Sequence, residues 1–374
     1  MSEEIKKGLM GVTVDETAIS KVMPEINSLT YRGYAAQDLC NKCKFEEVAY
    51  LILNGELPNK KQLKDFEKQE AKERNLSKTL VDAIKKIPKK AHPMDVARTA
   101  VSIMGLEDKE TRDNSPKANM RKVMRIFAKT PVALAAFYRS RKGKKIISPK
   151  KSLSFSENFF YMCFGKVPSQ DIVKAFDVSL ILYAEHSFNV STFTARTITS
   201  SLSDIHGAIT GAIASLKGPL HGGANEEVMH MMSKIKKPEN AFKWINNALD
   251  NKDVVMGFGH RVYKSGDSRV PTMREYFGKV AKIKKDKKFE KIYDIVEKVM
   301  IERKDIHPNV DYPTGPTYHL MGFDTDFFTP IFVISRITGW SAHIIEQHAS
   351  NKLIRPLASY NGNQYRKVIQ LNQR

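Results

Sequence analysis

Apolar residues recur along most of this chain at the three- and four-residue spacing of helices that bury one face. Alternating patterns typical of strands are scarce, and so are the short turn signals that join hairpins. Residues 172–183 are apolar on nearly every side, which predicts a buried helix with Ser169 as its N-terminal cap. His186 follows the end of that helix. The pattern therefore predicts an all-α protein.

Small residues dominate the segment 190–216, in which Gly207 and Gly211 lie one helical turn apart. Small side chains on one helical face let another helix approach closely, either in a domain core or at a subunit interface. The Gly218-Pro219 pair that follows predicts the end of this helical segment.

A further helix is predicted to begin at Thr329, because a capping residue there precedes a proline that the first helical turn tolerates. Gly339 is expected to end this helix, and Arg336 lies on its later turns. Charged residues, Pro, Gly and Ser replace the apolar pattern in two stretches, which predicts loops there. These stretches are 107–119 and 142–156.

With 374 residues and 41% hydrophobic content, the chain has room for two domains or one large one. Residues 1–10 are too charged for a secretory signal, and no apolar run approaches the length of a membrane span. Three cysteines, Cys40, Cys43 and Cys163, cannot all pair, which favours a reducing compartment. Cys40 and Cys43 have redox-motif spacing without its context, so we interpret them as ordinary helix residues. We expect a soluble, cytoplasmic protein.

The formal net charge of +20 raises the alternative of a basic nucleic-acid-binding protein. The lysines and arginines are divided among separate clusters with acidic residues between them, and no nucleic-acid-binding motif accompanies them. We therefore expect solvated faces, and a positive field that favours acidic metabolites and the phosphates of coenzyme A. The clusters are 85–90, 139–151, 234–237 and 282–288.

Three segments carry candidate chemistry for a small polyanion. His221 and His260 each lie among glycines, where the backbone can approach a ligand closely. Arg269 follows nine positions after His260, and Asp311 lies further along the chain. Two imidazoles, a guanidinium and a carboxylate together suit proton transfer and carboxylate binding.

These segments resemble the citrate synthase family, in which a Gly-aromatic-Gly-His segment ends in Asp-Ser-Arg or Asp-Pro-Arg, as residues 257–269 do. The resemblance extends from 29–34 to 351–356. It implies a two-domain helical fold with the active site in a cleft. The large domain would comprise 1–220 plus 322–374, and the small domain 221–321.

The resemblance also implies roles for individual residues. Asp311 would be the catalytic base, His221 would stabilise the enolate of the acyl-CoA, and His260 would polarise the ketone of oxaloacetate. The implied oxaloacetate-binding residues are His186, Arg269, Arg336 and Arg355, with Arg355 reaching the neighbouring subunit's site in a homodimer. The implied CoA-binding residues are Val254, Val255, Met256, Gly257, Phe258 and Lys264.

The segments 91–99, 182–186, 328–334 and 339–347 resemble the 2-methylcitrate synthase branch of the family. This implies that propionyl-CoA, oxaloacetate and water yield 2-methylcitrate and CoA, with side activity on acetyl-CoA. Citrate synthesis from acetyl-CoA stays the alternative, since one methylene in an apolar pocket is worth only about 1 to 3 kcal/mol. Ser187 departs from the family pattern, because many relatives have Glu after the histidine.

Two patterns approximate cofactor motifs and fail at a required position. In residues 343–348, Gln347 disturbs the spacing of an inverted zinc-protease motif. Val262 stands where a dinucleotide fingerprint starting at Gly257 needs its last glycine. We therefore predict neither a metal nor NAD, and we expect acyl-CoA only as a co-substrate.

Overall fold

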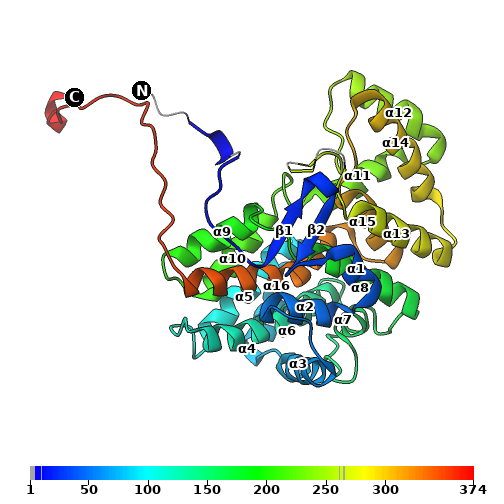
Figure 1. Ribbon diagram of the computed structural model, residues 1–374, viewed down its shortest axis with the longest axis horizontal. Helices are drawn as coiled ribbons and strands as arrows, with labels where there is room; N and C mark the ends of the chain where they lie inside the picture. The colour runs from blue at the N-terminus through cyan, green and yellow to red at the C-terminus, as the bar shows by residue number, and fades with distance from the viewer. Residues whose placement is uncertain (1–4, 10, 261, 264–265) are drawn as a thin grey trace.

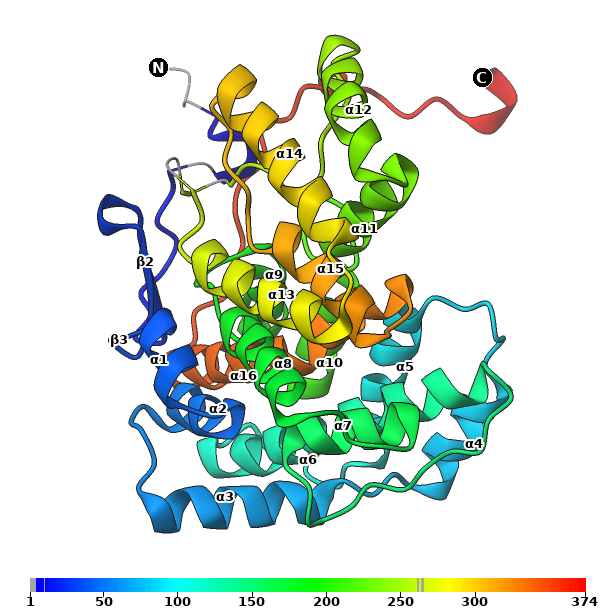
Figure 2. The same ribbon diagram turned by 90° about the vertical axis from the view of Figure 1, so that its right-hand side faces the viewer.

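A computed structural model describes residues 5–9, 11–260, 262–263 and 266–374. The described part is mostly helical, as predicted, and contains sixteen α-helices (Figures 1 and 2). The helices are α1 (Ala36–Lys42), α2 (Phe45–Asn54), α3 (Lys60–Glu73), α4 (Lys78–Lys86), α5 (Pro93–Glu107), α6 (Pro116–Ser140), α7 (Phe155–Phe164), α8 (Gln170–Tyr183), α9 (Val190–Ser200), α10 (Ile205–Leu216), α11 (Ala224–Ile235), α12 (Pro238–Asp250), α13 (Val270–Lys284), α14 (Lys288–Lys304), α15 (Asp311–Met321) and α16 (Phe328–Ala349).

A small antiparallel sheet near the N-terminus is absent from the sequence prediction. Its strands are β1 (Ser20–Met23), β2 (Ser28–Tyr31) and β3 (Tyr34–Ala35), in the order β1-β2-β3. Ser20 pairs with Tyr31, and Tyr31 pairs with Tyr34. Strands of two to four residues are too short to produce a recognisable alternating pattern, which is why the sequence did not reveal them.

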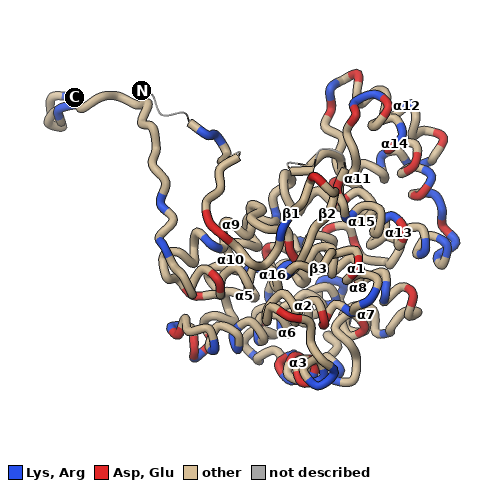
Figure 3. The backbone as a smooth tube through the Cα atoms, in the orientation of Figure 1, with Lys and Arg blue, Asp and Glu red and all other residues tan. Residues whose placement is uncertain are grey.

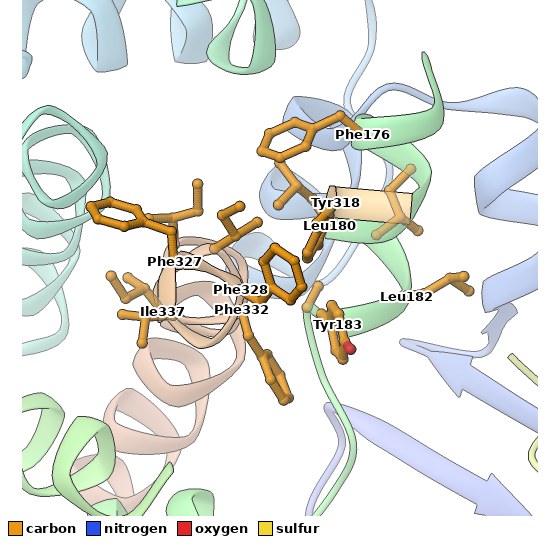
Figure 4. Packing of buried hydrophobic residues seen from close by; sticks show 14 of the residues in the cluster. Phe176, Leu180, Leu182, Tyr183, Tyr318, Phe327, Phe328, Phe332 and Ile337 are labelled. Carbon is orange, nitrogen blue, oxygen red and sulfur yellow. The ribbon is translucent and has the colours of Figure 1, made fainter. Parts of the chain in front are cut away.

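Helices α8 and α16 run through the core and carry residues of the site. Nearly every residue of α16 up to Ile344 is buried, and α8 is buried from Ile172 to Tyr183 except for Lys174. Figure 4 shows Phe176 and Leu180 of α8 near Phe328 and Tyr318 in one apolar cluster. The prediction of a buried helix over 172–183 is confirmed.

The predicted end of α16 at Gly339 is wrong. The helix begins at Phe328, one residue before Thr329, and continues through Gly339 to Ala349. A Cβ at position 339 would lie 2.2 Å from Glu185 Oε2 and 2.5 Å from the Ala184 carbonyl oxygen. Gly339 is therefore a contact point where the end of α8 approaches α16, and it has no capping role.

The helical stop at Gly218-Pro219 is confirmed, since α10 ends at Leu216. The small-residue segment forms two helices, α9 and α10, that pack closely. A Cβ at Gly211 would lie 2.2 Å from Ile198 Cδ1, so the glycine allows this approach. The loops predicted around 107–119 and 142–156 lie between α5 and α6 and between α6 and α7, although α6 already begins at Pro116.

Helices α11, α12 and α14 lie together at one end of the molecule in both views, and α13 follows them toward the middle (Figures 1 and 2). Within this group α12 packs on α14, while α13 also contacts α8 and α15. The division into domains at 220 and 322 stays a prediction.

Basic and acidic residues are interspersed along the chain, and its C-terminal segment is extended. Figure 3 shows Lys and Arg on several separate segments with Asp and Glu between them. Asn351 and Ile354 still bind Ser200 of α9, and residues 355–374 extend away from the helices, with one short 3-10 turn near the end (Figure 1). Across the described residues, none of the helices combines the length and the apolar character needed to cross a membrane.

Candidate active site

Asp311 is the first residue of α15 and is half-buried. Its backbone N–H donates to Asn309 Oδ1 at 3.1 Å, and the Tyr183 hydroxyl donates to its Oδ1 at 2.5 Å. Burial raises the pKa of Asp311 to about 6, although the Tyr183 hydroxyl and the Arg269 charge oppose the rise. A carboxylate with such a pKa is a stronger base than an exposed one and is still ionised at neutral pH.

His221 lies in the loop between α10 and α11. The Ser191 backbone N–H donates to His221 Nε2 at 3.2 Å, and this nitrogen must therefore be unprotonated. Burial, with a smaller contribution from the charge of Arg336, lowers the pKa of His221 to about 3. The neutral ring therefore carries its proton on Nδ1, where it can donate a hydrogen bond. Ser191 Oγ also lies 2.8 Å from His221 Nε2, and Trp340 Nε1 donates to this hydroxyl oxygen at 3.1 Å.

His260 has the opposite tautomer. The backbone N–H groups of Val262 and Tyr263 donate to His260 Nδ1 at 3.0 and 3.1 Å. In the neutral ring the proton therefore lies on Nε2. The two loop histidines can thus each present one N–H donor, from different ring nitrogens.

His186 lies beside His260, with the ring centroids 5.1 Å apart. Burial lowers the pKa of His186 well below its ordinary value, and the charges of Arg269 and His260 add to this effect. Its Nε2 is buried without a hydrogen-bond partner in the described part of the chain. Ser187, the departure from the family pattern, has its N–H bound to Ser20 Oγ at 2.8 Å.

Arg269 pairs with Asp267 in a bidentate arrangement. Its Nε donates to Asp267 Oδ1 at 2.9 Å and its Nη2 to Oδ2 at 2.7 Å, which leaves Nη1 outside this pair. Although burial opposes ionisation, Arg269 holds the pKa of Asp267 well below its usual range. Asp267 Oδ2 also accepts from the Val310 N–H at 3.1 Å, which places Arg269 beside the start of α15.

Arg336 is buried on α16. Its Nε donates to the carbonyl oxygen of Tyr183 at 2.6 Å, and its guanidinium lies 4.6 Å from the ring centroid of Phe332. Its Nη1 is buried and has no hydrogen-bond partner among the described residues. Burial lowers the pKa of Arg336 to about 10, so the group is still cationic at neutral pH.

The predicted CoA segment 254–258 lies against the chain that leads to Asp311. The Asn309 N–H donates to the Gly257 carbonyl oxygen at 2.9 Å, and the Phe258 ring packs against Tyr312 with centroids 4.5 Å apart and planes inclined by 52°. Gly257 has a φ of +85°, and a Cβ there would lie 2.9 Å from the Tyr312 side chain. Val255 is buried, Met256 is half-buried, and the Val254 side chain is 81% exposed.

A cavity of about 240 Å³ opens beside this segment. His260, Tyr263, Asp267 and His307 are among the residues that line it. The cavity therefore lies against the loop of His260, next to the predicted CoA segment along the chain.

Two predicted site residues are not brought into this cluster. Arg355 is exposed on the extended segment after α16, where the chain does not fold back on itself. Lys264 lies outside the described residues. The described residues contain no group of three or more metal-binding side chains. His343, from the rejected zinc pattern, binds Glu185 at 3.0 Å.

Sequence analysis missed the residues that orient the predicted site. Asp267 stands two positions before Arg269, and this spacing could have identified it as an ion-pair partner. Tyr183, Ser191 and Trp340 gave no comparable signal, because each contacts residues that are far away in sequence.

Known proteins of one family resemble this chain over nearly its whole length. Residues 8–357 match the family model described as citrate synthase, C-terminal domain. The chain is 54% identical to 2-methylcitrate synthase 2 of Corynebacterium glutamicum, covering 99% of this chain and 98% of that protein. It is 52% identical to a citrate synthase of Mycolicibacterium smegmatis, covering 98% and 97% of the two chains.

A solved structure shares the fold. This is the ternary complex of Thermoplasma acidophilum citrate synthase with carboxymethyl coenzyme A and oxaloacetate, at a TM-score of 0.94 and 31% identity. The match covers 99% of this chain and 100% of that one. The chain therefore belongs to the citrate synthase family and is an acyltransferase of the type that converts an acyl group into an alkyl group on transfer.

Proposed function

We propose that this enzyme condenses propionyl-CoA with oxaloacetate and hydrolyses the thioester to give 2-methylcitrate and CoA. Acetyl-CoA is expected to react more slowly. The observation that carries the proposal is a pair of buried nitrogens, Arg336 Nη1 and His186 Nε2, without hydrogen-bond partners among the described residues. Both residues belong to the site of Asp311 and His260: the charge of Arg336 lowers the pKa of Asp311, and the charge of His260 lowers the pKa of His186. A dicarboxylate would supply the missing partners.

The first step forms the nucleophile. Asp311 removes a proton from the α-carbon of the acyl-CoA, while the Nδ1–H of His221 donates a hydrogen bond to the thioester oxygen. This donor is needed because the α-hydrogen of a thioester is a far weaker acid than a carboxylic acid. The neutral ring of His221, which burial favours, still carries the Nδ1–H that donates to the enolate oxygen.

The second step joins the two substrates. The enolate carbon attacks the ketone carbon of oxaloacetate, and the ketone oxygen takes a proton from Nε2 of His260 as it becomes a hydroxyl group. The proton that Asp311 removed from the acyl-CoA then returns to Nε2 of His260, so that both groups end in their starting state. Arg269 and Arg336 hold the two carboxylates, because planar guanidinium groups pair with carboxylates in a bidentate manner. Water then cleaves the thioester and releases CoA and the product.

The complete enzyme is proposed to be a homodimer in which Arg355 reaches the neighbouring subunit's oxaloacetate. The exposed position of Arg355 on an extended segment supports this arrangement. The residues of segment 254–258, together with Lys264, are proposed to bind the CoA adenine and phosphate groups. With the proposed two-domain division at 220 and 322, the cleft would have His186 and Arg336 on the large-domain side and the loop histidines, Arg269 and Asp311 on the small-domain side.

The preference for propionyl-CoA is supported by the 54% identity to a 2-methylcitrate synthase. Citrate synthesis is the second candidate, because a relative named citrate synthase matches at 52% identity. One methylene changes binding by only about 1 to 3 kcal/mol, so both substrates are expected to react.

The test is steady-state release of CoA thiol with oxaloacetate, with propionyl-CoA and acetyl-CoA measured in parallel. We expect a higher kcat/KM for propionyl-CoA. A clear preference for acetyl-CoA would make the enzyme a citrate synthase instead. The Asp311→Asn variant is the control, because thiol released by a contaminating hydrolase would persist in it.

A further inference from the structure

The side chain of Tyr183 connects the last residue of α8 to the first residue of α15. Its hydroxyl donates to Asp311 Oδ1 at 2.5 Å, across 128 positions of sequence. We propose that Tyr183 is a positioning residue that orients the Asp311 carboxylate for proton abstraction and couples it to Arg336. This inference rests on the proposed function, because it takes Asp311 as the base.

The ring of Tyr183 is held on a second side. It stacks on Phe332 of α16, with centroids 4.0 Å apart and planes inclined by 28°. Figure 4 shows the ring at the edge of the apolar cluster, with its hydroxyl oxygen pointing away from Phe328 and Leu180. The ring therefore cannot swing without losing this packing, and the hydroxyl is held in place at Asp311.

The backbone of Tyr183 supplies the link to the arginine. Its carbonyl oxygen accepts from Arg336 Nε at 2.6 Å, and the Arg336 guanidinium lies over the same Phe332 ring. One residue thus contacts both the predicted base and a predicted carboxylate-binding arginine. These contacts set the distance between the Asp311 carboxylate and the Arg336 guanidinium.

The direction of the hydrogen bond follows from burial and charge. Burial and the neighbouring Asp311 raise the pKa of Tyr183 well above its ordinary value, so the phenol keeps its proton and donates. Because Oδ1 accepts this hydrogen bond, Oδ2 is the oxygen left to remove the substrate proton. The same bond counteracts the rise in the pKa of Asp311 that burial produces.

Replacing Tyr183 by Phe removes the hydroxyl but keeps the stacked ring and the backbone carbonyl. Without the hydrogen bond, we expect the apparent pKa of the acid limb of the kcat/KM profile to rise by about 1 to 2 units. We expect kcat on the plateau to fall about 10- to 100-fold, the size of a misplaced catalytic group. The KM for oxaloacetate should stay near its wild-type value, because the contact with Arg336 persists.

Tyr318→Phe is the matched control. The Tyr318 hydroxyl donates to Ser179 Oγ at 2.9 Å, so it also joins α15 to α8, but it does not bind Asp311. Ser179 keeps its bond to the Phe176 carbonyl oxygen when Tyr318 is replaced. This variant should lose a buried hydrogen bond between the same two helices and keep the wild-type pH profile.

Steady-state thiol release is measured from pH 5 to 9 for the wild type, Tyr183→Phe and Tyr318→Phe. A wild-type profile and kcat in Tyr183→Phe, or an equal shift in both variants, would overturn the positioning role. Should Tyr183→Phe fail to fold, 3-fluorotyrosine at position 183 keeps the hydroxyl and strengthens it as a donor. The acid limb should then move to lower pH, and an unchanged limb would again overturn the role.

Asp311→Asn separates this inference from the function on which it rests. If that variant keeps wild-type turnover, Asp311 is not the base and the proposed mechanism fails first. If it is inactive while Tyr183→Phe behaves as the wild type, only the role of Tyr183 fails. Inactivity of Asp311→Asn together with a shifted acid limb in Tyr183→Phe supports both.

Discussion

At the scale of single residues, burial and hydrogen bonding act on Asp311 in opposite directions. Removal from water favours the protonated carboxyl group, while the Tyr183 hydroxyl and the Arg269 charge favour the carboxylate. The balance leaves the pKa at about 6 instead of 3.8. The fold therefore bears an ionised, buried carboxylate at neutral pH, which is a cost in stability at the predicted base.

Asp311→Asn is expected to stabilise the protein at alkaline pH while it abolishes most turnover. The folded chain holds the Asp311 proton up to about pH 6, whereas the unfolded chain releases it near pH 4, so stability falls as the pH rises between these values. The loss reaches about 3 kcal/mol above pH 6. Urea denaturation should show a larger gain for the variant at pH 8 than at pH 5. An equal gain at both pH values would contradict the raised pKa.

At the scale of elements, contacts between helices decide features that local pattern does not. Gly339 resembles a helix end in the sequence, yet α16 continues for ten further residues to Ala349. A glycine stands at this position because Ala184 and Glu185 approach the backbone of α16 too closely for any side chain. The same approach places Arg336, one turn earlier, against the end of α8.

Gly339→Ala should therefore destabilise the fold by about 2 kcal/mol, in the range of overpacked cores, although Ala is the better helix former. Gly278→Ala in α13 is the control. Its added Cβ meets only the ends of two flexible side chains, Glu290 Oε1 at 3.2 Å and Arg274 Nη1 at 3.6 Å. Thermal unfolding should separate the two variants. A Gly339→Ala protein as stable as Gly278→Ala would show that α8 and α16 are not in such close contact.

At the scale of the whole molecule, the C-terminal segment leaves several large apolar side chains exposed to solvent. Leu357, Tyr365 and Val368 each have more than 80% of their surface exposed, at 82%, 97% and 88%. Arg355 lies in the same segment, away from the predicted site of its own chain. Both observations favour a second copy of the chain as the surface on which the segment packs.

Mixed dimers of Arg355→Ala and Asp311→Asn chains test this arrangement. Each variant alone is expected to be nearly inactive. If Arg355 acts on the partner's site, each mixed dimer contains one complete site, so random assembly of equal amounts restores about a quarter of the sites. Thiol release after co-refolding measures this recovery. No recovery, with mixed dimers demonstrated by a tag on one chain, would place Arg355 in its own chain's site or in neither.

The helical character, the buried helix over 172–183 and the end of α10 could be predicted from the amino-acid sequence, because they follow from the local spacing of apolar residues and from Gly-Pro chemistry. The order of His221, His260, Arg269 and Asp311 was also sufficient to indicate the family. Each of these signals lies within a short stretch of chain.

Which atoms of these residues are available for chemistry follows from contacts in the folded chain. The tautomer of His221 depends on Ser191, thirty positions earlier, and the orientation of Asp311 depends on Tyr183, 128 positions earlier. The need for a glycine at position 339, within α16, likewise depends on Glu185. Hydrogen bonds, burial and close packing join residues that are distant in sequence, and a one-dimensional pattern does not record those distances.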